Sequence, residues 1–206
     1  MSSIRLLVVE DTSKHMDDAR RYAQQLVGVT VDFASTLAEA MELLQKNAYD
    51  GVICDVFFPA AAGASTETFE NAITLSTKLV EMGVQHVFNT AGNHHGRKYE
   101  GFIWKTPRVI HTENPDDCYD FRTTGMIIES YESDADTDSK QWEAAFRYIL
   151  LVKELLQLPD KGTQIINKEC GDAFCGFPYG DYGELTERLR NCSHSFVVEV
   201  FKKYNA

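Results

Sequence analysis

The chain has 206 residues, of which 44% are hydrophobic, and carries a formal net charge of −11. This length fits one large domain, or one domain of ordinary size with an appendage, and the hydrophobic fraction argues against general disorder. The negative net charge argues against a protein that binds a nucleic-acid backbone, because such proteins need clustered lysine and arginine. No apolar run approaches the ~20 residues of a membrane span. We therefore expect neither nucleic acid nor a membrane as a direct partner.

The five cysteines are odd in number and irregularly spaced. This argues against a disulfide framework and favours a reducing compartment. The N-terminus also runs directly into a predicted strand, without the basic and apolar regions of a secretory signal. We expect a cytoplasmic protein.

The first half of the chain alternates apolar runs with helical patterns. Strands are expected at 4–9, 29–33 and in the run that ends at Asp55, with helices between them at about 13–27 and 36–47. Thr12 or Ser13 is expected to cap the first helix, and Ser35 the second. A β-α-β-α-β order of this kind is typical of a doubly wound parallel sheet, so we expect an α/β, flavodoxin-like fold.

The chain continues in the same alternation. A loop is expected at 58–66, a third helix at 67–82, and a fourth strand at 84–90. Gly83 is expected to end the helix, as glycine commonly does after a helical C-terminus.

Two segments are candidates for the fifth strand, 101–105 and 125–130. The second leads directly into a long amphipathic helix expected at 139–157, so chain order favours it. Residues 92–123 are then an insertion in place of a fourth helix.

The whole arrangement would be one α/β domain at 1–157 with a five-stranded parallel sheet, followed by a small C-terminal extension at 158–206 of unknown role. The window 113–138 holds nine acids and a single base, Arg122, and reads as a solvated loop.

Three carboxylates follow predicted strand ends. Glu10 and Asp11 come after the first strand, and Asp55 ends the third. If these strands are neighbours, the acids meet at the carboxyl edge of the sheet, where open α/β sheets bind ligands. Like charges at such short range need a cation or a raised pKa, and a hard oxygen-ligand site for Mg²⁺ is the natural resolution.

These motifs resemble the receiver domain of bacterial response regulators: an acidic pair after the first strand, Asp55-x-x-x-Pro59 after the third, and Thr90-Ala91 after the fourth. The resemblance covers residues 4–91 well and 92–157 poorly. It implies that Asp55 accepts a phosphoryl group from a phosphohistidine.

The resemblance also implies further roles at this site. Glu10, Asp11, Asp55 and the backbone carbonyl of Phe57 would hold Mg²⁺. Thr90 would hydrogen-bond the phosphoryl group.

The family also has a lysine that pairs with the phosphoryl group. Which residue of this chain occupies its position depends on which segment is strand five. It is Lys105 if the first candidate is strand five. If the second is, Glu129 takes its position, and Lys105 or Arg97 would have to reach in from the insertion.

Other polar clusters are weaker candidates. His94 and His95 could contact phosphate or a metal, but they read more simply as part of a solvated loop. Zinc would need Cys170, Cys175, Cys192 and His194, whose spacing is irregular for such a site.

We expect a phosphorylation-dependent switch in a two-component phosphorelay. Its partners would be a sensor histidine kinase or phosphotransfer protein and a downstream protein target. Its only chemistry would be self-phosphorylation and autodephosphorylation.

One alternative is a pseudo-receiver that binds without phosphotransfer. The other is a Mg²⁺-dependent phosphohydrolase, which would need a second acid where Phe57 stands.

Overall fold

The computed structural model describes residues 4–65, 67–91, 102, 126–129, 131–132, 135–136 and 140–155. Within these ranges, five parallel strands form the main sheet in the order β2-β1-β3-β6-β7. The strands are β1 (Ile4–Val9), β2 (Val29–Ala34), β3 (Gly51–Cys54), β6 (His86–Thr90) and β7 (Met126–Glu129). This is the strand order of flavodoxin-like folds, so the predicted α/β fold class is confirmed. The expected extension at 158–206 lies outside the described residues.

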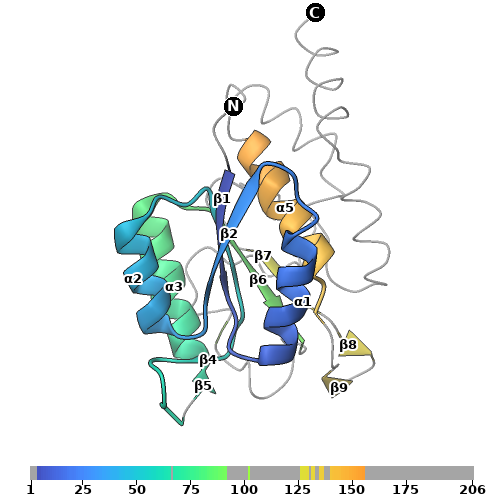
Figure 1. Cartoon of the computed structure of the whole chain (residues 1–206). Helices are drawn as coiled ribbons and strands as arrows, with labels where there is room; N and C mark the ends of the chain where they lie inside the picture. The colour runs from blue at the N-terminus through green and yellow to red at the C-terminus, as the bar shows by residue number, and fades with distance from the viewer. Residues whose placement is uncertain are drawn as a thin grey trace, which may run out of the picture.

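In the part of the chain that the structure describes, four helices cover the two faces of this sheet. They are α1 (Ser13–Ala23), α2 (Leu37–Lys46), α3 (Phe69–Met82) and α5 (Trp142–Leu155). Helices α2 and α3 lie on one face, and α1 and α5 lie on the other (Figure 1). Every residue of β3 and β6 is buried between these layers, which is why β3 reads as a continuous apolar run. No helix in the described part of the chain is long and apolar enough to cross a membrane.

Two helix boundaries differ from the prediction. Helix α1 ends at Ala23 and not near Val27, whose residue surface is 98% exposed. The amides of Gln25 and Leu26 bond to carbonyls three residues back, and such tightened turns end a helix. Helix α2 is capped by Thr36 and not by Ser35.

The cap of α2 is a reciprocal pair. The Thr36 hydroxyl accepts from the amide of Glu39 at 3.1 Å, and the Glu39 carboxylate accepts from the amide of Ser35 at 2.7 Å. Ser35 therefore belongs to the capping box as the residue before the cap.

The start of α3 also differs, because residues 67–68 are not helical. They form β5 (Glu67–Thr68), which pairs antiparallel with β4 (Phe58–Pro59). The segment 58–66, expected to be a loop, thus begins with a short strand. Gly83 ends α3 with φ of 70°, as predicted.

The fifth strand of the sheet is the second of the two candidates. Met126–Glu129 forms β7, beside β6, with Glu129 opposite Thr90. Of the segment 92–123, the structure describes Phe102, whose buried ring lies 5.1 Å from that of Phe88. Between β7 and α5, two short strands, β8 (Tyr131–Glu132) and β9 (Ala135–Asp136), pair with each other.

Helix α5 lies very close to the centre of the sheet. A Cβ added at Gly51 would come within 2.5 Å of Ile149 Cγ2, so only glycine leaves room for the helix at this point of β3. At its N-terminal end the Phe146 ring stacks on Tyr22 of α1, with centroids 5.3 Å apart. The helix is therefore packed against both the sheet and its neighbour.

Candidate functional site

The backbone of the first and third strands brings the predicted acids together. Strands β1 and β3 are neighbours, with Val9 opposite Cys54. The amide of Asp55 donates to the carbonyl of Val9 at 2.9 Å, and that of Glu10 donates to Ala34 at 2.9 Å. Both residues are therefore held at the carboxyl edge of the sheet by ladder bonds that continue past the strands.

Glu10, Asp11 and Asp55 form one acidic cluster. Each offers a carboxylate oxygen, and these oxygens all lie within 4.8 Å of one another. Glu10 is fully buried and Asp55 is 8% exposed, whereas Asp11 is half-buried. Buried charges at such distances need compensation from a cation.

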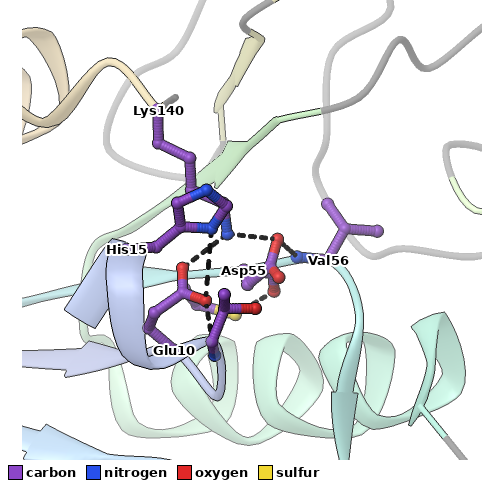
Figure 2. Close-up of polar contacts among 7 residues, drawn as sticks. Glu10, His15, Asp55, Val56 and Lys140 are labelled. Atoms are coloured by element: carbon purple, nitrogen blue, oxygen red, sulfur yellow. Dashed lines mark hydrogen bonds and ion pairs between the residues drawn. The ribbon is translucent and has the colours of Figure 1, made fainter. Parts of the chain in front are cut away.

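A lysine that the sequence did not single out supplies part of that compensation. Lys140 lies two residues before the first residue of α5, Trp142, and its Nζ lies 2.5 Å from Glu10 Oε2 and 2.9 Å from Asp55 Oδ1. Figure 2 shows this ammonium group between the two carboxylates. Only 1% of the side chain is exposed. One lysine against three carboxylates leaves an excess of two negative charges.

The charges in this cluster alter one another's ionisation. Burial opposes the charge of Lys140, but the carboxylates of Asp55 and Glu10 outweigh it and raise its pKa. Burial also raises the pKa of Asp55, where the charge of Glu10 adds to the effect and Lys140 opposes it. For Glu10 burial is again the largest influence, but its hydrogen-bonding and charged neighbours together outweigh it and lower its pKa. The cluster therefore holds Lys140 and Glu10 as an ion pair.

The remaining contacts hold the two buried carboxylates in place. Glu10 Oε1 accepts from the amide of Thr12 at 3.0 Å and lies 3.7 Å from Nδ1 of His15, on α1. Asp55 Oδ1 accepts from the amide of Val56 at 2.7 Å. Its position is thus set by the turn after β3 as well as by Lys140.

Thr90 and Phe57 stand at the same edge of the sheet. Thr90 is the last residue of β6 and is 2% exposed. Phe57 lies two residues after Asp55, and its ring meets that of Phe69 edge-on at 6.3 Å. Phe57 therefore places no second carboxylate beside Asp55.

Several predicted site residues fall outside the described residues. These are Lys105, Arg97, His94, His95, Cys170, Cys175, Cys192 and His194. The register of β6 and β7 sets Glu129 next to Thr90, where the resemblance implies a lysine. The cation beside the acids is Lys140, which comes from the start of the following helix.

One signal in the sequence could have pointed to Lys140. It follows the acid-rich window and stands directly before an apolar helical pattern. A cation is disfavoured at the N-terminal end of a helix, where the macrodipole is positive. A lysine at that position therefore indicates that carboxylates from elsewhere in the fold compensate its charge.

The cluster suits a divalent cation. Oxygen ligands from carboxylates are those that Mg²⁺ prefers, and the excess of two negative charges matches its own charge. Glu10, Asp11 and Asp55 are the side chains that could hold it.

Similar solved structures include receiver domains and response regulators. The signal receiver domain of an HD domain-containing protein from Pseudomonas fluorescens Pf-5 has a TM-score of 0.49 and 15% identity, over 77% of this chain and 96% of its own. RcsB from Salmonella enterica serovar Typhimurium, bound to promoter rprA, has a TM-score of 0.42 and 15% identity, over 98% and 89%. The non-phosphorylated HemR receiver domain from Leptospira biflexa has a TM-score of 0.34 and 22% identity, over 60% and 80%.

These proteins are of the kind that the sequence resembles. The fold class rests on the strand order itself. No protein-family model matches the sequence, and no curated protein matches it.

Proposed function

We propose that this chain is a phosphoacceptor receiver, in which Asp55 takes a phosphoryl group from the phosphohistidine of a sensor kinase or phosphotransfer protein. The observation that carries this proposal is the bridge from Lys140 to both Asp55 and Glu10 within the acidic cluster. A carboxylate nucleophile, a buried cation and two further acids are the groups that phosphoryl transfer to a carboxylate requires.

The proposed step is a displacement at phosphorus. An oxygen of Asp55 attacks, the P–N bond to the donor imidazole breaks, and an acyl phosphate forms. The imidazole nitrogen keeps the electron pair of the broken bond and takes up a proton from solvent. Mg²⁺, held by Glu10, Asp11, Asp55 and, as the resemblance implies, the carbonyl of Phe57, would neutralise charge on the transferred group.

Lys140 takes the role that the resemblance gave to Lys105 in the case that 101–105 were strand five. Its ammonium group already contacts the oxygen of Asp55, so it is placed to pair with a phosphoryl group attached there. Thr90, at the end of the neighbouring strand, is the hydroxyl that we assign to the same phosphoryl group. Hydrolysis of the acyl phosphate would return the protein to its starting state.

The partners follow from this chemistry. A phosphohistidine donor is a protein, and the acidic surface argues for a protein target in place of nucleic acid. Both would meet the chain in the cytoplasm, in line with its irregularly spaced cysteines.

The test is the intact mass of the protein after incubation with acetyl phosphate and Mg²⁺. We expect the parent to gain one phosphoryl group and Asp55→Asn to gain none. Lys140→Gln should slow the gain by tenfold or more, whereas Lys153→Gln, which removes the lysine near the other end of α5, should not. A parent that gains nothing, or an Asp55→Asn variant that gains as much, would overturn the proposal.

A pseudo-receiver is the second candidate, and one observation favours it. Both oxygens of Glu10 already have partners, the amide of Thr12 and the ammonium of Lys140. Such a satisfied cluster could hold the fold together without metal or phosphate. A calorimetric titration with MgCl₂ separates the two: no heat of binding, together with no gain in mass, would favour the pseudo-receiver.

A further inference from the structure

Helix α5 is anchored at each end by a lysine. At its start, Lys140 pairs with Glu10 and Asp55 at the carboxyl edge of the sheet. Near its end, Lys153 pairs with Asp50, at the opposite edge. Figure 1 shows the helix running along one face of the sheet, between these two edges.

The two anchors are chemically different. Asp50 also accepts from the backbone amide of Arg5 at 2.8 Å, and its own amide donates to the carbonyl of Arg5 at 2.8 Å. It is thus tied to β1 and has no part in the acidic cluster. The carboxylates that hold Lys140, in contrast, are those that would receive a phosphoryl group and a metal ion.

The middle of the helix has little room to move. Ile149 lies against Gly51 so closely that a single methyl group would not fit between them. The first turn instead depends on side-chain contacts. Trp142 is 6% exposed and lies 6.3 Å, centroid to centroid, from Phe146, which stacks on α1.

We infer that Lys140 makes the first turn of α5 the part of the fold that responds to the state of Asp55. This inference rests on the proposed function. A phosphoryl group on Asp55 places new anionic oxygens beyond the carboxylate, and a metal ion competes with the ammonium for Glu10. Lys140 then leaves Glu10, and the first turn moves with it, while Lys153 and Asp50 keep the far end in place.

The segment before Lys140 shares in this change. The paired strands β8 and β9 end at Asp136, shortly before Lys140 in the chain. The surface that a target protein reads would therefore include this hairpin and the start of α5.

Hydrogen exchange, followed by mass spectrometry, tests the inference in peptides from the two halves of α5. Without any phosphodonor, Lys140→Gln should speed exchange at residues 142–148 by tenfold or more and leave 150–155 unchanged. Lys153→Gln, the matched control, should affect the second peptide alone. If Lys140→Gln does not fold well, Asp55→Asn, which removes one of the two partners, should give a smaller change of the same kind.

The second arm adds acetyl phosphate and MgCl₂ to the parent and to Lys140→Gln. Faster exchange at 142–148 in the phosphorylated parent, with no further change in Lys140→Gln that has gained the same phosphoryl mass, is the expected result. A parent that gains the phosphoryl mass but keeps its exchange rate would overturn the inference and leave the proposed function standing. If no mass is gained, the proposed function fails, and the inference, which rests on it, fails with it.

Discussion

Ser76 Oγ lies 2.7 Å from His86 Nε2, and both residues are buried between α3 and the start of β6. The ring of His86 also meets Phe88 edge-on at 5.4 Å. An imidazole in such surroundings is stable in its neutral form, because protonation would leave a charge without water. Burial lowers the pKa of His86 to about 4.

This pKa predicts a loss of stability in mild acid. The unfolded chain takes up a proton near the ordinary pKa of histidine, about 6.5, and the folded protein does so only near 4. The contribution of neutral His86 is therefore complete above pH 6.5. It falls as the pH drops through this window, by at most about 1.4 kcal/mol per pH unit.

Urea unfolding at pH 7.5 and at pH 5.0 measures this effect. The parent should lose more free energy of unfolding between the two pH values than His86→Gln, which cannot titrate. Equal losses in the two proteins would show that His86 is not the titrating group.

The close approach of α5 to the sheet predicts that Gly51→Ala is destabilising. The added methyl group would meet Ile149 Cγ2 at 2.5 Å, and overpacking of this kind typically costs about 1–3 kcal/mol. In an Ile149→Ala background the same substitution should cost much less, because the clashing atom is gone. Chemical denaturation of the two single variants and the double variant gives the coupling. Additive losses would contradict the packing described above.

Removal of the buried cation should weaken the fold strongly. Lys140→Gln leaves Glu10 and Asp55 close together without their partner, and breaking a buried ion pair in this way costs about 3–5 kcal/mol. The partly exposed pair of Lys153 and Asp50 should be worth about 1 kcal/mol or less, so Lys153→Gln is the matched control.

Thermal unfolding of these variants, with and without Asp55→Asn in addition, gives the measurement. Asp55→Asn should restore part of what Lys140→Gln loses, since it removes one of the two uncompensated charges. A Lys140→Gln variant as stable as Lys153→Gln would mean that the acids are compensated by other means.

A metal ion at the acidic cluster should raise the stability of the folded protein. Because the three carboxylates come together only in the fold, MgCl₂ should raise the melting temperature in proportion to the logarithm of its concentration, and EDTA should reverse the rise. Asp11→Asn should reduce the effect while leaving both contacts of Lys140 intact. A rise of the same size in Asp11→Asn and parent would place the ion elsewhere.

Much of the sheet was predictable because its strands are buried on both faces. The runs that end at Val9 and Cys54 are mostly apolar, and each is followed directly by a carboxylate residue. The fifth strand was harder, because 101–105 and 125–130 are equally apolar. Chain order decided it, since a strand that leads directly into the next helix needs no further connection.

The helix ends were predicted less well, for local reasons. Ser35 and Thr36 can both cap a helix, and Thr36 is the cap because its hydroxyl accepts from the Glu39 amide, while the Glu39 carboxylate accepts from Ser35. Residues 67–68 pair with β4 across a loop. This pairing cannot be predicted from the helical periodicity of the sequence. Prediction of such boundaries needs the tertiary partner.

The acids of the site were predictable, and the lysine was not. Glu10, Asp11 and Asp55 each follow a strand, so the parallel sheet itself brings them together. Lys140 reaches them from just before a helix, and its place there indicates a need for carboxylate partners without indicating which carboxylates they are. The resemblance directed attention to Lys105, which lies in the first candidate for strand five.

The contact between Glu10 and Lys140 spans 130 residues of sequence. During synthesis, β1 and β3 can pair early, but their carboxylates stay uncompensated until residue 140 has left the ribosome. Contacts between such distant residues form late and make folding slow. In a nascent chain that stops short of α5, the carboxylates at this edge of the sheet therefore lack their lysine partner. In that state a chaperone or a metal ion could bind them in place of Lys140.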